Sequence, residues 1–294
     1  MTTITAKIVA DSKSPNGVRI ITMELVYPRF IHAEFMTHRQ FSRNASSSRA
    51  IPVERQIRAI EEDPAVPLYW GKNQKGMQAG EEWDARIVYI HSDTGVIDNN
   101  MHREEAWLMA KQNAVDMAKA FAAAGYHKQI VNRLLEPFSH IRVLVTATEW
   151  ANFFSLRLHA DAEPHIQHLA RQMASAITTS ESVTLSFGSW HLPYVDPFEN
   201  EGLTIAERVK ISVARCARVS YLTHESKAPR IDEDLALYDR LIMAKPMHAS
   251  PAEHQAFPDR QDMQLRVWSN SHMHGNFIGW CQNRKVLEQQ GAIS

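Results

Sequence analysis

The sequence has few cysteines, no long hydrophobic run and no excess of charge of either sign, and each absence excludes a class of protein. Two cysteines among 294 residues, Cys216 and Cys281, cannot form a disulfide framework or a four-thiolate zinc site, so we expect a reducing, cytoplasmic setting. No stretch approaches the roughly 18 apolar residues of a membrane helix, and no signal-peptide-like run occurs near Met1, so we expect no membrane association and no export. Lys and Arg number 32 against 33 Asp and Glu, which predicts no general affinity for nucleic acid.

The common phosphate-binding and hydrolase motifs are absent too. The only Gly-x4-Gly pair, Gly71 and Gly76, is followed by Met77 and Gln78 where a phosphate-binding loop has Lys and Ser or Thr. No Gly-x-Gly-x-x-Gly, Gly-x-Ser-x-Gly or His-Glu-x-x-His occurs. The chain therefore has neither a Walker site nor a Rossmann fingerprint.

Composition and periodicity predict a mixed α/β protein. The apolar share of 44% and the charged share of 22% are those of an ordinary globular chain. Residues 19–28 predict a strand that ends at a proline and that residues 30–37 continue, whereas residues 40–48 predict a loop and residues 61–100 an irregular segment. Helices are expected over residues 103–124 before Gly125, from Pro164 to Ile177, from a Thr204 cap through residue 216, and over residues 233–244 after an Asp232 cap.

Fifteen histidines raise the question of a metal site. His272 and His274 would project to one face of a strand, and His248, Glu253 and His254 offer nitrogen and oxygen ligands. Neither group has the thiolates or the i, i+4 pairing that marks a strong zinc site. We therefore expect hydrogen-bonded or solvated histidines and no metal.

The segment from residue 29 to residue 58 concentrates positive charge in an otherwise neutral chain. Six arginines lie here against only Glu34 and Glu54, and hydroxyl side chains are interleaved with them. A planar guanidinium binds phosphate oxygens in a bidentate manner, and loop backbone N–H groups add donors. The segment is thus either a phosphate cradle or a solvated basic loop. The residues concerned are Arg29, Arg39, Arg43, Arg49, Arg55 and Arg58, with Ser42, Ser46, Ser47 and Ser48.

A second candidate is the aromatic stretch from Trp150 to Arg157. An arginine at the end of an apolar stretch is partly desolvated, and a buried guanidinium needs an anionic or carbonyl partner. The alternative is a core helix whose arginine extends its charged end to solvent.

Together these segments resemble the flavin-dependent thymidylate synthase family. The family signature is Arg-His-Arg, seven residues, a Ser and, two residues later, an Arg. Thr37-His38-Arg39, Ser47 and Arg49 match it at every position but the first. Arg133-Leu-Leu-Glu-Pro137 matches the family's Arg-x-x-x-Pro segment. Asn152 to Arg157 and Ala162 to Ile166 match an Asn-containing helix that leads to Leu-Arg and then to Ala-Gln-x-Glu-Ile.

Two more family segments occur in an unusual order. Ala217-Arg-Val-Ser220 and His248-Ala-Ser-Pro-Ala-Glu-His254 resemble stretches that usually precede the Arg-His-Arg strand, but here they follow it. The resemblance therefore implies a permuted topology, with one mixed α/β domain over residues 1–294 and a mainly antiparallel sheet. Its matched parts are residues 19–52, 128–178 and 212–285, the last being a permuted flavin-binding segment, and residues 61–125 are an unmatched insertion.

The resemblance also implies site residues. Arg157 stands where the family places the arginine that polarises the pyrimidine ring, and Ser47, Arg49 and Arg133 are the expected phosphate partners. The remaining expected nucleotide contacts are Glu34, Thr37, Ser46 and Ser48. The implied flavin contacts are His38, Arg39, Asn152, Ser220, His248, Ser250 and Glu253. Neither cysteine is required, since the family mechanism uses no enzyme nucleophile.

Three positions depart from the family pattern. Thr37 replaces an arginine, Ala45 replaces a frequent Glu or Gln, and Glu34 replaces a common Gln. Arg43 is the nearest cation that could substitute at residue 37. A carboxylate at residue 34 could favour a base that carries an amino group, such as cytosine, because an ionised carboxylate only accepts hydrogen bonds.

The activity that the resemblance implies is reductive methylation of dUMP at carbon 5, with FAD as cofactor and with methylenetetrahydrofolate and NADPH as co-substrates. It also implies a homotetramer with sites shared between subunits. One alternative is a related methylase or hydroxymethylase of dUMP or dCMP that serves nucleotide or DNA modification. A second is a non-catalytic nucleotide- or RNA-binding protein.

Overall fold

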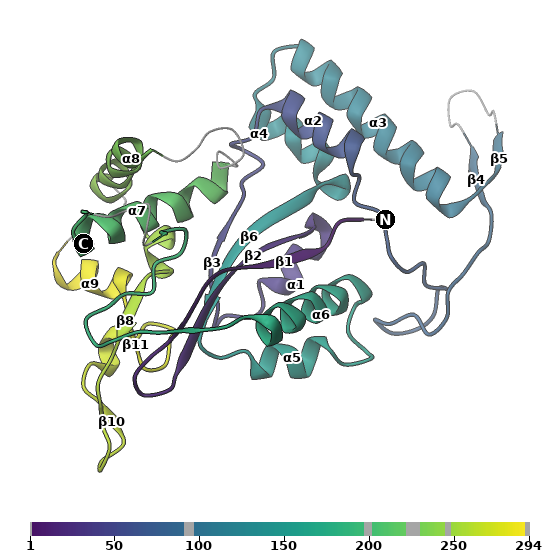
Figure 1. Cartoon of the computed structure of the whole chain (residues 1–294). Coiled ribbons are helices and arrows are strands. Elements are labelled where there is room, and N and C mark those ends of the chain that lie inside the picture. The colour runs from purple at the N-terminus through teal and green to yellow at the C-terminus, as the bar shows by residue number, and fades with distance from the viewer. Residues whose placement is uncertain (1, 91–96, 197–201, 222–229, 245–247, 292–294) are drawn as a thin grey trace.

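The centre of the molecule is a five-stranded sheet with the strand order β3-β6-β2-β1-β7 (Figure 1). The computed structural model describes residues 2–90, 97–196, 202–221, 230–244 and 248–291. Every strand pair of this sheet is antiparallel except β1 with β7. The strands are β1 (Thr5–Lys13), β2 (Arg19–Pro28), β3 (Ser42–Ala45), β6 (His140–Ala147) and β7 (Val183–Thr184). The expected mixed α/β class with a mainly antiparallel sheet is confirmed.

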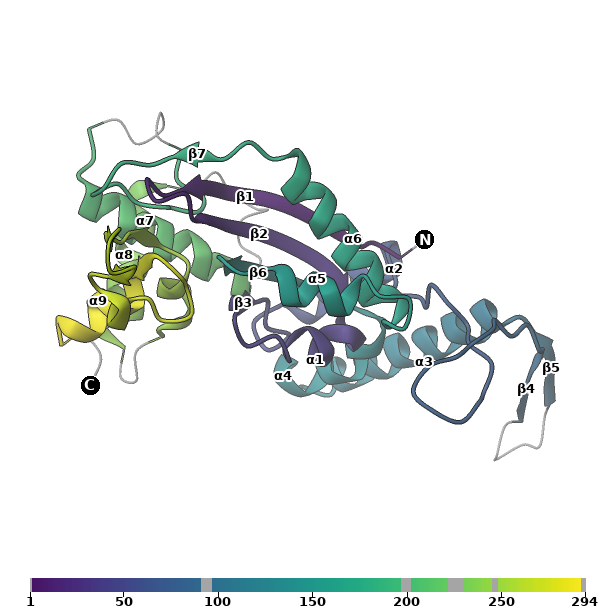
Figure 2. The ribbon, with the colours of Figure 1, turned by 90° about the horizontal axis from the view of Figure 1, so that it is seen from below.

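One face of the sheet carries the main hydrophobic core. Alternate side chains of β2 and β6, among them Met23, Leu25 and Val143, are fully buried on this face, because successive residues of a strand project to opposite sides. They pack with Phe35 and Phe153 of the neighbouring helices. Two of these helices, α5 and α6, lie against the sheet in Figure 2. The helices that join this core are α1 (His32–Phe35), α5 (Ala151–Arg157) and α6 (Pro164–Thr179).

The opposite face of the sheet is polar at its centre. Thr22 and Thr146 meet there with their Oγ1 atoms 2.7 Å apart. Thr22 Oγ1 lies 2.8 Å from Nε2 of His191, and Thr146 Oγ1 lies 2.8 Å from Nδ1 of His254. Nδ1 of His191 lies 2.9 Å from Oγ of Ser12. All five residues are buried, so an unbroken chain of hydrogen bonds fastens residues 191 and 254 to the sheet.

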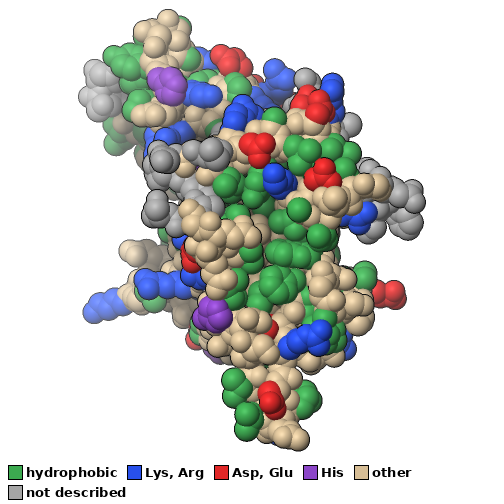
Figure 3. Space-filling model, turned by 90° about the vertical axis from the view of Figure 1, so that its left-hand side faces the viewer, with side chains coloured by type: hydrophobic (Ala, Val, Ile, Leu, Met, Phe, Trp, Pro, Cys, Tyr) green, Lys and Arg blue, Asp and Glu red, His purple; other side chains and the backbone are tan. Residues whose placement is uncertain are grey.

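The C-terminal segment packs on this polar face and along the edge strand β3. Helices α7 and α8 are joined by ion pairs, since Arg215 and Arg218 both contact the buried carboxylate of Asp234. The hairpin of β9 and β10 projects from the lower end of the molecule in Figure 3 and exposes apolar side chains. The elements are α7 (Ile205–Arg218), η3 (Val219–Tyr221), α8 (Ile231–Met243), η5 (Ser250–Glu253), β8 (Ala256–Pro258), β9 (Gln261–Asp262), β10 (Val267–Trp268), η6 (Ser271–Met273), β11 (Trp280–Gln282) and α9 (Asn283–Gln289).

A second hydrophobic cluster lies beyond the end of the sheet. Val115 and Ala118 of one helix pack with Ile57, Ile60 and Leu135. The elements concerned are α2 (Val53–Glu62), α3 (Arg103–Ala123), α4 (Lys128–Val131) and η2 (Asn132–Phe138). A two-stranded hairpin, β4 (Ile87–Ile90) and β5 (Ile97–Met101), extends past α3, away from the sheet (Figure 2).

Most of the expected elements are confirmed. The strand over residues 19–28 is β2, α3 ends before Gly125 at a φ of +84°, and Thr204 forms a capping box with Glu207 at the start of α7. Helix α6 also begins at Pro164 as expected, with Glu163 as its N-cap.

Four expectations are wrong in detail. Residues 30–37 do not extend the sheet but form η1 (Arg29–Ile31) and α1, which turn the chain back over the core after Pro28. The loop expected over residues 40–48 contains strand β3, because Ser42–Ala45 pair with β6. Helix α8 begins after Arg230 rather than after Asp232, whose side chain pairs with that arginine. His272 and His274 do not share a strand face, since η6 and its C-cap hold them.

In the part of the chain that the structure describes, no helix has the length and apolarity that crossing a bilayer requires.

Candidate functional site

A short turn between α1 and β3 carries the residues of the central motif. Arg43, at the second position of β3, donates from Nη1 to the carbonyl oxygens of Met36 at 2.8 Å and His38 at 3.1 Å. The cation expected to substitute for the missing arginine at residue 37 is therefore engaged with the backbone of the turn. This contact fixes residues 36–38 against the sheet edge.

Helix α5 brings Arg157 to this turn. Its Nε donates to Nε2 of His38 at 2.9 Å, and its Nη2 lies 3.4 Å from Oγ1 of Thr37. Its Nη1 lies 3.9 Å from the Glu34 carboxylate. Four residues that the sequence singles out are thus neighbours. The Arg157 side chain is 20% exposed, so its guanidinium is partly desolvated and has an anionic partner.

The charges of this group are set by burial and by the arginines. Burial first, then the positive charges of Arg157 and Arg43, lower the pKa of His38 to about 4. The imidazole is therefore neutral near pH 7, and because Nε2 accepts the hydrogen bond from Arg157, the ring proton is on Nδ1. Burial and the nearby Glu163 raise the pKa of Glu34, against the opposing effect of Arg157.

A pocket of about 180 Å³ opens beside the turn and α5. Arg39 and Asn152 line it, are exposed, and make no side-chain hydrogen bond with any residue that the structure describes. Leu156, which is 53% exposed, adds an apolar wall. The pocket thus offers an unpaired cation, a free amide and an apolar surface together. Its full lining is Thr37, His38, Arg39, Gln40, Phe41, Glu149, Asn152, Phe153, Leu156 and Arg157.

The serine-rich segment after β3 is held by internal hydrogen bonds. Ser46 Oγ accepts from the backbone N–H of Arg142 at 3.1 Å, and Ser48 Oγ donates to Glu136 at 2.7 Å. The backbone N–H of Ser47 donates to the carbonyl oxygen of Ser220 at 3.0 Å. Two of the three hydroxyls expected to contact the nucleotide, those of Ser46 and Ser48, are therefore engaged inside the protein.

Glu136 gathers the neighbouring cations. It lies 3.4 Å from Nε of Arg29 and 3.7 Å from Nη1 of Arg133, besides its contact with Ser48. Arg133 remains 62% exposed. Arg49 is exposed and makes no side-chain hydrogen bond or ion pair within the described part of the chain. Ser48 and Arg133 are thus linked through Glu136, while Arg49 points to solvent.

The expected flavin residues of the C-terminal segment differ in the contacts that hold them. Ser220 Oγ donates to Oδ1 of Asn44 at 3.0 Å, and the amide of Asn44 donates to the carbonyl oxygen of Cys216 at 2.6 Å. Glu253 forms an ion pair with Arg284. His248 and Ser250 are exposed and make no side-chain hydrogen bond with the described residues.

Asn44, for which the sequence predicted no role in the site, fixes this segment to β3. Its position inside the arginine-rich segment is the only signal that the sequence carried. A buried amide with both ends satisfied by residues more than 170 positions away is visible only after folding.

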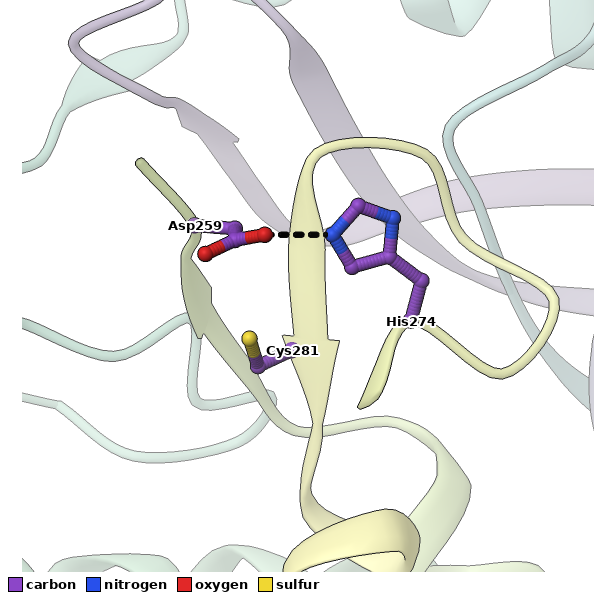
Figure 4. A group of neighbouring side chains, drawn as sticks. All are labelled: Asp259, His274 and Cys281. Carbon is purple, nitrogen blue, oxygen red and sulfur yellow. Dashed lines mark hydrogen bonds and ion pairs between the residues drawn. The ribbon is translucent and has the colours of Figure 1, made fainter. Parts of the chain in front are cut away.

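Three buried metal-type donors meet in the C-terminal segment (Figure 4), and of these only His274 is among the candidate ligands that the sequence suggested. His274 Nε2 lies 2.9 Å from Asp259 Oδ2, and the backbone N–H of Gly279 donates to His274 Nδ1 at 3.3 Å. Asp259 also accepts from Arg260 and Asn270.

Asp259 and His274 are already engaged with each other by a hydrogen bond. Although burial acts to raise it, hydrogen bonds from Asn270, His274 and Arg260 lower the pKa of Asp259. Burial and the nearby Asp259 raise the pKa of Cys281 to about 12. With its proton on Nε2, His274 donates to Asp259, and this hydrogen bond anchors the loop between residues 259 and 274.

Comparison with known proteins adds a family and two solved structures. The model of the family described as thymidylate synthase complementing protein matches residues 8–180. No curated protein matches the chain. Similar solved structures include those of the UMP/dUMP methylase PolB from Streptomyces cacaoi bound with 5-Br UMP and with 5-Br dUMP, at 17% and 16% identity and TM-scores of 0.44 and 0.43. They cover 60% of this chain and 90% and 91% of theirs. The family match runs from β1 to α6, so the segment after residue 180 lies outside it.

Proposed function

Because the chain belongs to the thymidylate synthase complementing protein family, we propose that it methylates carbon 5 of dUMP, with FAD as cofactor, methylenetetrahydrofolate as one-carbon donor and NADPH as reductant. It is an enzyme of the flavin-dependent thymidylate synthase-like methyltransferase class. The family match spans more than half of the chain and includes Glu34, His38, Arg133 and Arg157.

The position of Arg157 carries the proposal. Its Nε is fixed by neutral His38, whereas among the described residues its two terminal nitrogens have only long contacts, at 3.4 Å to Thr37 and 3.9 Å to Glu34. A ring carbonyl or ring nitrogen of a pyrimidine can therefore compete for these nitrogens. A fixed guanidinium in a partly desolvated site stabilises negative charge that develops on the ring, which raises electron density at carbon 5.

We assign the phosphate to Ser47, Arg49 and Arg133. The guanidinium of Arg49 has no competing partner among the described residues, and that of Arg133 has only a 3.7 Å contact with Glu136. Both can therefore form charge-assisted bonds with phosphate oxygens. Ser46 and Ser48 support the loop through Arg142 and Glu136 rather than contact the ligand.

The donor set beside the turn fits a flavin. Arg39 would hold the pyrophosphate, Asn152 and His38 would face polar edges of the ring system, and Leu156 would provide an apolar contact. Ser220, His248, Ser250 and Glu253 complete the proposed flavin set. When bound and reduced, FAD supplies the hydride of the reaction.

We further propose a cytoplasmic homotetramer whose sites are shared between subunits. Within the described part of the chain, no hydrogen bond or ion pair joins the phosphate residues Arg49 and Arg133 to Arg157. A site composed from neighbouring copies would bring the two groups to one nucleotide.

The test begins with the absorbance spectrum of the purified protein. Flavin bands are expected, and incubation with dUMP, methylenetetrahydrofolate and NADPH should give a product heavier by one methyl group in mass analysis. The matched control is Arg157→Lys, which keeps the charge but loses the planar fork and should be impaired.

Three outcomes would refute parts of this proposal. A colourless protein that still binds dUMP would indicate a non-catalytic nucleotide-binding protein. Methylation or hydroxymethylation of dCMP alone would correct the acceptor. Activity that persists without reduced flavin would refute the cofactor assignment.

A further inference from the structure

The turn that carries His38 and Arg39 is held at three alternate carbonyl groups. Arg43 bonds the first two, at Met36 and His38. The third, the carbonyl of Gln40, accepts from Nδ2 of Asn276 at 2.8 Å. Asn276 lies 236 positions later in the chain, between η6 and β11, and belongs to none of the motifs recognised in the sequence.

Gln282, at the end of β11, fixes the side chain of Asn276. Its Nε2 lies 2.8 Å from Oδ1 of Asn276, 3.1 Å from Oγ of Ser42 and 3.1 Å from the carbonyl oxygen of Glu253. Only 3% of Gln282 is exposed. One buried amide therefore connects strand β3, the loop before β11 and the 3-10 helix η5.

Two further features hold the loop around Asn276 in place. Gly275 has a φ of +62°, and a Cβ there would lie 2.5 Å from Oε1 of Gln282, so only glycine allows the approach. The backbone N–H of Ile278 donates to Oγ1 of Thr148, the residue that follows β6. The loop is thus anchored to the sheet on one side and to the motif turn on the other.

We propose that Asn276 and Gln282 are positioning residues of the site, which hold the His38–Arg39 turn at a fixed distance from the segment that carries Glu253. This role rests on the proposed function only where it concerns flavin. Asn276 and Gln282 form a joint between the two segments that carry proposed flavin residues, which are the His38–Arg39 turn and the segment with Glu253. Asn276 and Gln282 would fix the position of the C-terminal segment relative to residues 8–180, which match the family. Neither residue needs to touch the ligand.

Two substitutions each remove a different hydrogen bond of this joint. Gln282→Met conserves the volume but removes the amide that contacts Asn276, Ser42 and Glu253, so that Oδ1 of Asn276 keeps only the Ser42 hydroxyl, at 3.1 Å, among the described residues. Asn276→Asp keeps the acceptor that faces Gln282 and loses only the donor to Gln40, where a carboxylate oxygen would then oppose a carbonyl oxygen. The two variants break the same path at different points. Gln112→Met on the exposed face of α3 is the matched control.

The first readout is the pKa of His38 in flavin-free protein, followed by NMR of the imidazole C–H signals. In the wild type this pKa is about 4, because the buried ring lies against Arg157 and near Arg43. Release of the turn would expose the His38 ring to water, so both variants should raise its pKa toward the ordinary value of 6.5. Gln112→Met should leave it unchanged. Loss of fold stability alone would lower the melting temperature without moving this titration.

The second readout is flavin affinity, measured by quenching of FAD fluorescence. Both variants should bind FAD about tenfold more weakly or worse, because binding must then restore the turn geometry that the lost hydrogen bond held in the free protein. An unchanged His38 pKa together with an unchanged flavin affinity in both variants would overturn the positioning role. If the wild type binds no flavin, the proposed function fails, and the His38 titration still tests the joint.

Discussion

The buried histidines on the polar face of the sheet should make the stability strongly dependent on pH. Burial lowers the pKa of both His191 and His254 to about 3, and each ring is neutral in the chain of hydrogen bonds through Thr22 and Thr146. In the unfolded chain the ordinary value is 6.5. Above pH 6.5 neither state is protonated, so the stability is fully present. As the pH falls below 6.5, the unfolded state binds protons that the folded state does not bind, and the free energy of unfolding therefore decreases.

The expected loss follows from proton linkage. Each histidine should contribute about 1.4 kcal/mol of destabilisation per pH unit between its unfolded and folded pKa values. Between pH 6.5 and pH 5 this amounts to about 2 kcal/mol for each ring, or about 4 kcal/mol for both. A typical domain is stable by only about 5–15 kcal/mol, so the effect is large.

The assay is urea denaturation at several pH values between 7 and 5, with the free energy of unfolding extrapolated to water. His254→Gln removes one titrating ring, so its slope against pH should be smaller than that of the wild type by about 1.4 kcal/mol per unit. His159→Gln is the control, since the side chain of His159 is 63% exposed. Equal slopes for the wild type and His254→Gln would refute the linkage argument.

Three further predictions concern the proposed site. Arg157→Ala should keep its flavin and bind nucleotide but lose about a hundredfold to a thousandfold in turnover, as for one charge-stabilising donor; full turnover per bound flavin would contradict a catalytic role. Arg49→Ala should weaken dUMP binding by about tenfold to a hundredfold in calorimetric titration while exposed Arg171→Ala does not; equal wild-type affinity for deoxyuridine would remove the phosphate assignment. Glu34→Gln should lower the affinity for dCMP relative to dUMP by about tenfold in competition binding, because the carboxylate only accepts from an amino group; an unchanged ratio would show that residue 34 does not contact the base.

Local chemistry allowed several elements to be predicted from the sequence. The Thr204 capping box, the apolar period after Pro164 and the glycine after α3 each depend on residues within a few positions of one another. The strand over residues 19–28 was equally readable, because β-branched residues alternate there between the two faces of the sheet. Where packing against other segments decides the secondary structure, prediction from local residues was wrong. Residues 30–37 have a strand-like composition, yet they fold as η1 and α1 against the core.

The sequence by itself also determined which residue types are available for chemistry, because the motifs are short and can be recognised from their spacing along the chain. The tertiary structure decided which of them meet. His38 and Arg157 are 119 positions apart, and Ser42 and Gln282 are 240 apart. A hydrogen bond between such residues depends on the packing of the whole sheet and of the helices around it, and no local propensity encodes that packing. For the same reason only the folded chain shows that Arg43 is engaged by backbone carbonyls and that Asn276 reaches the motif turn.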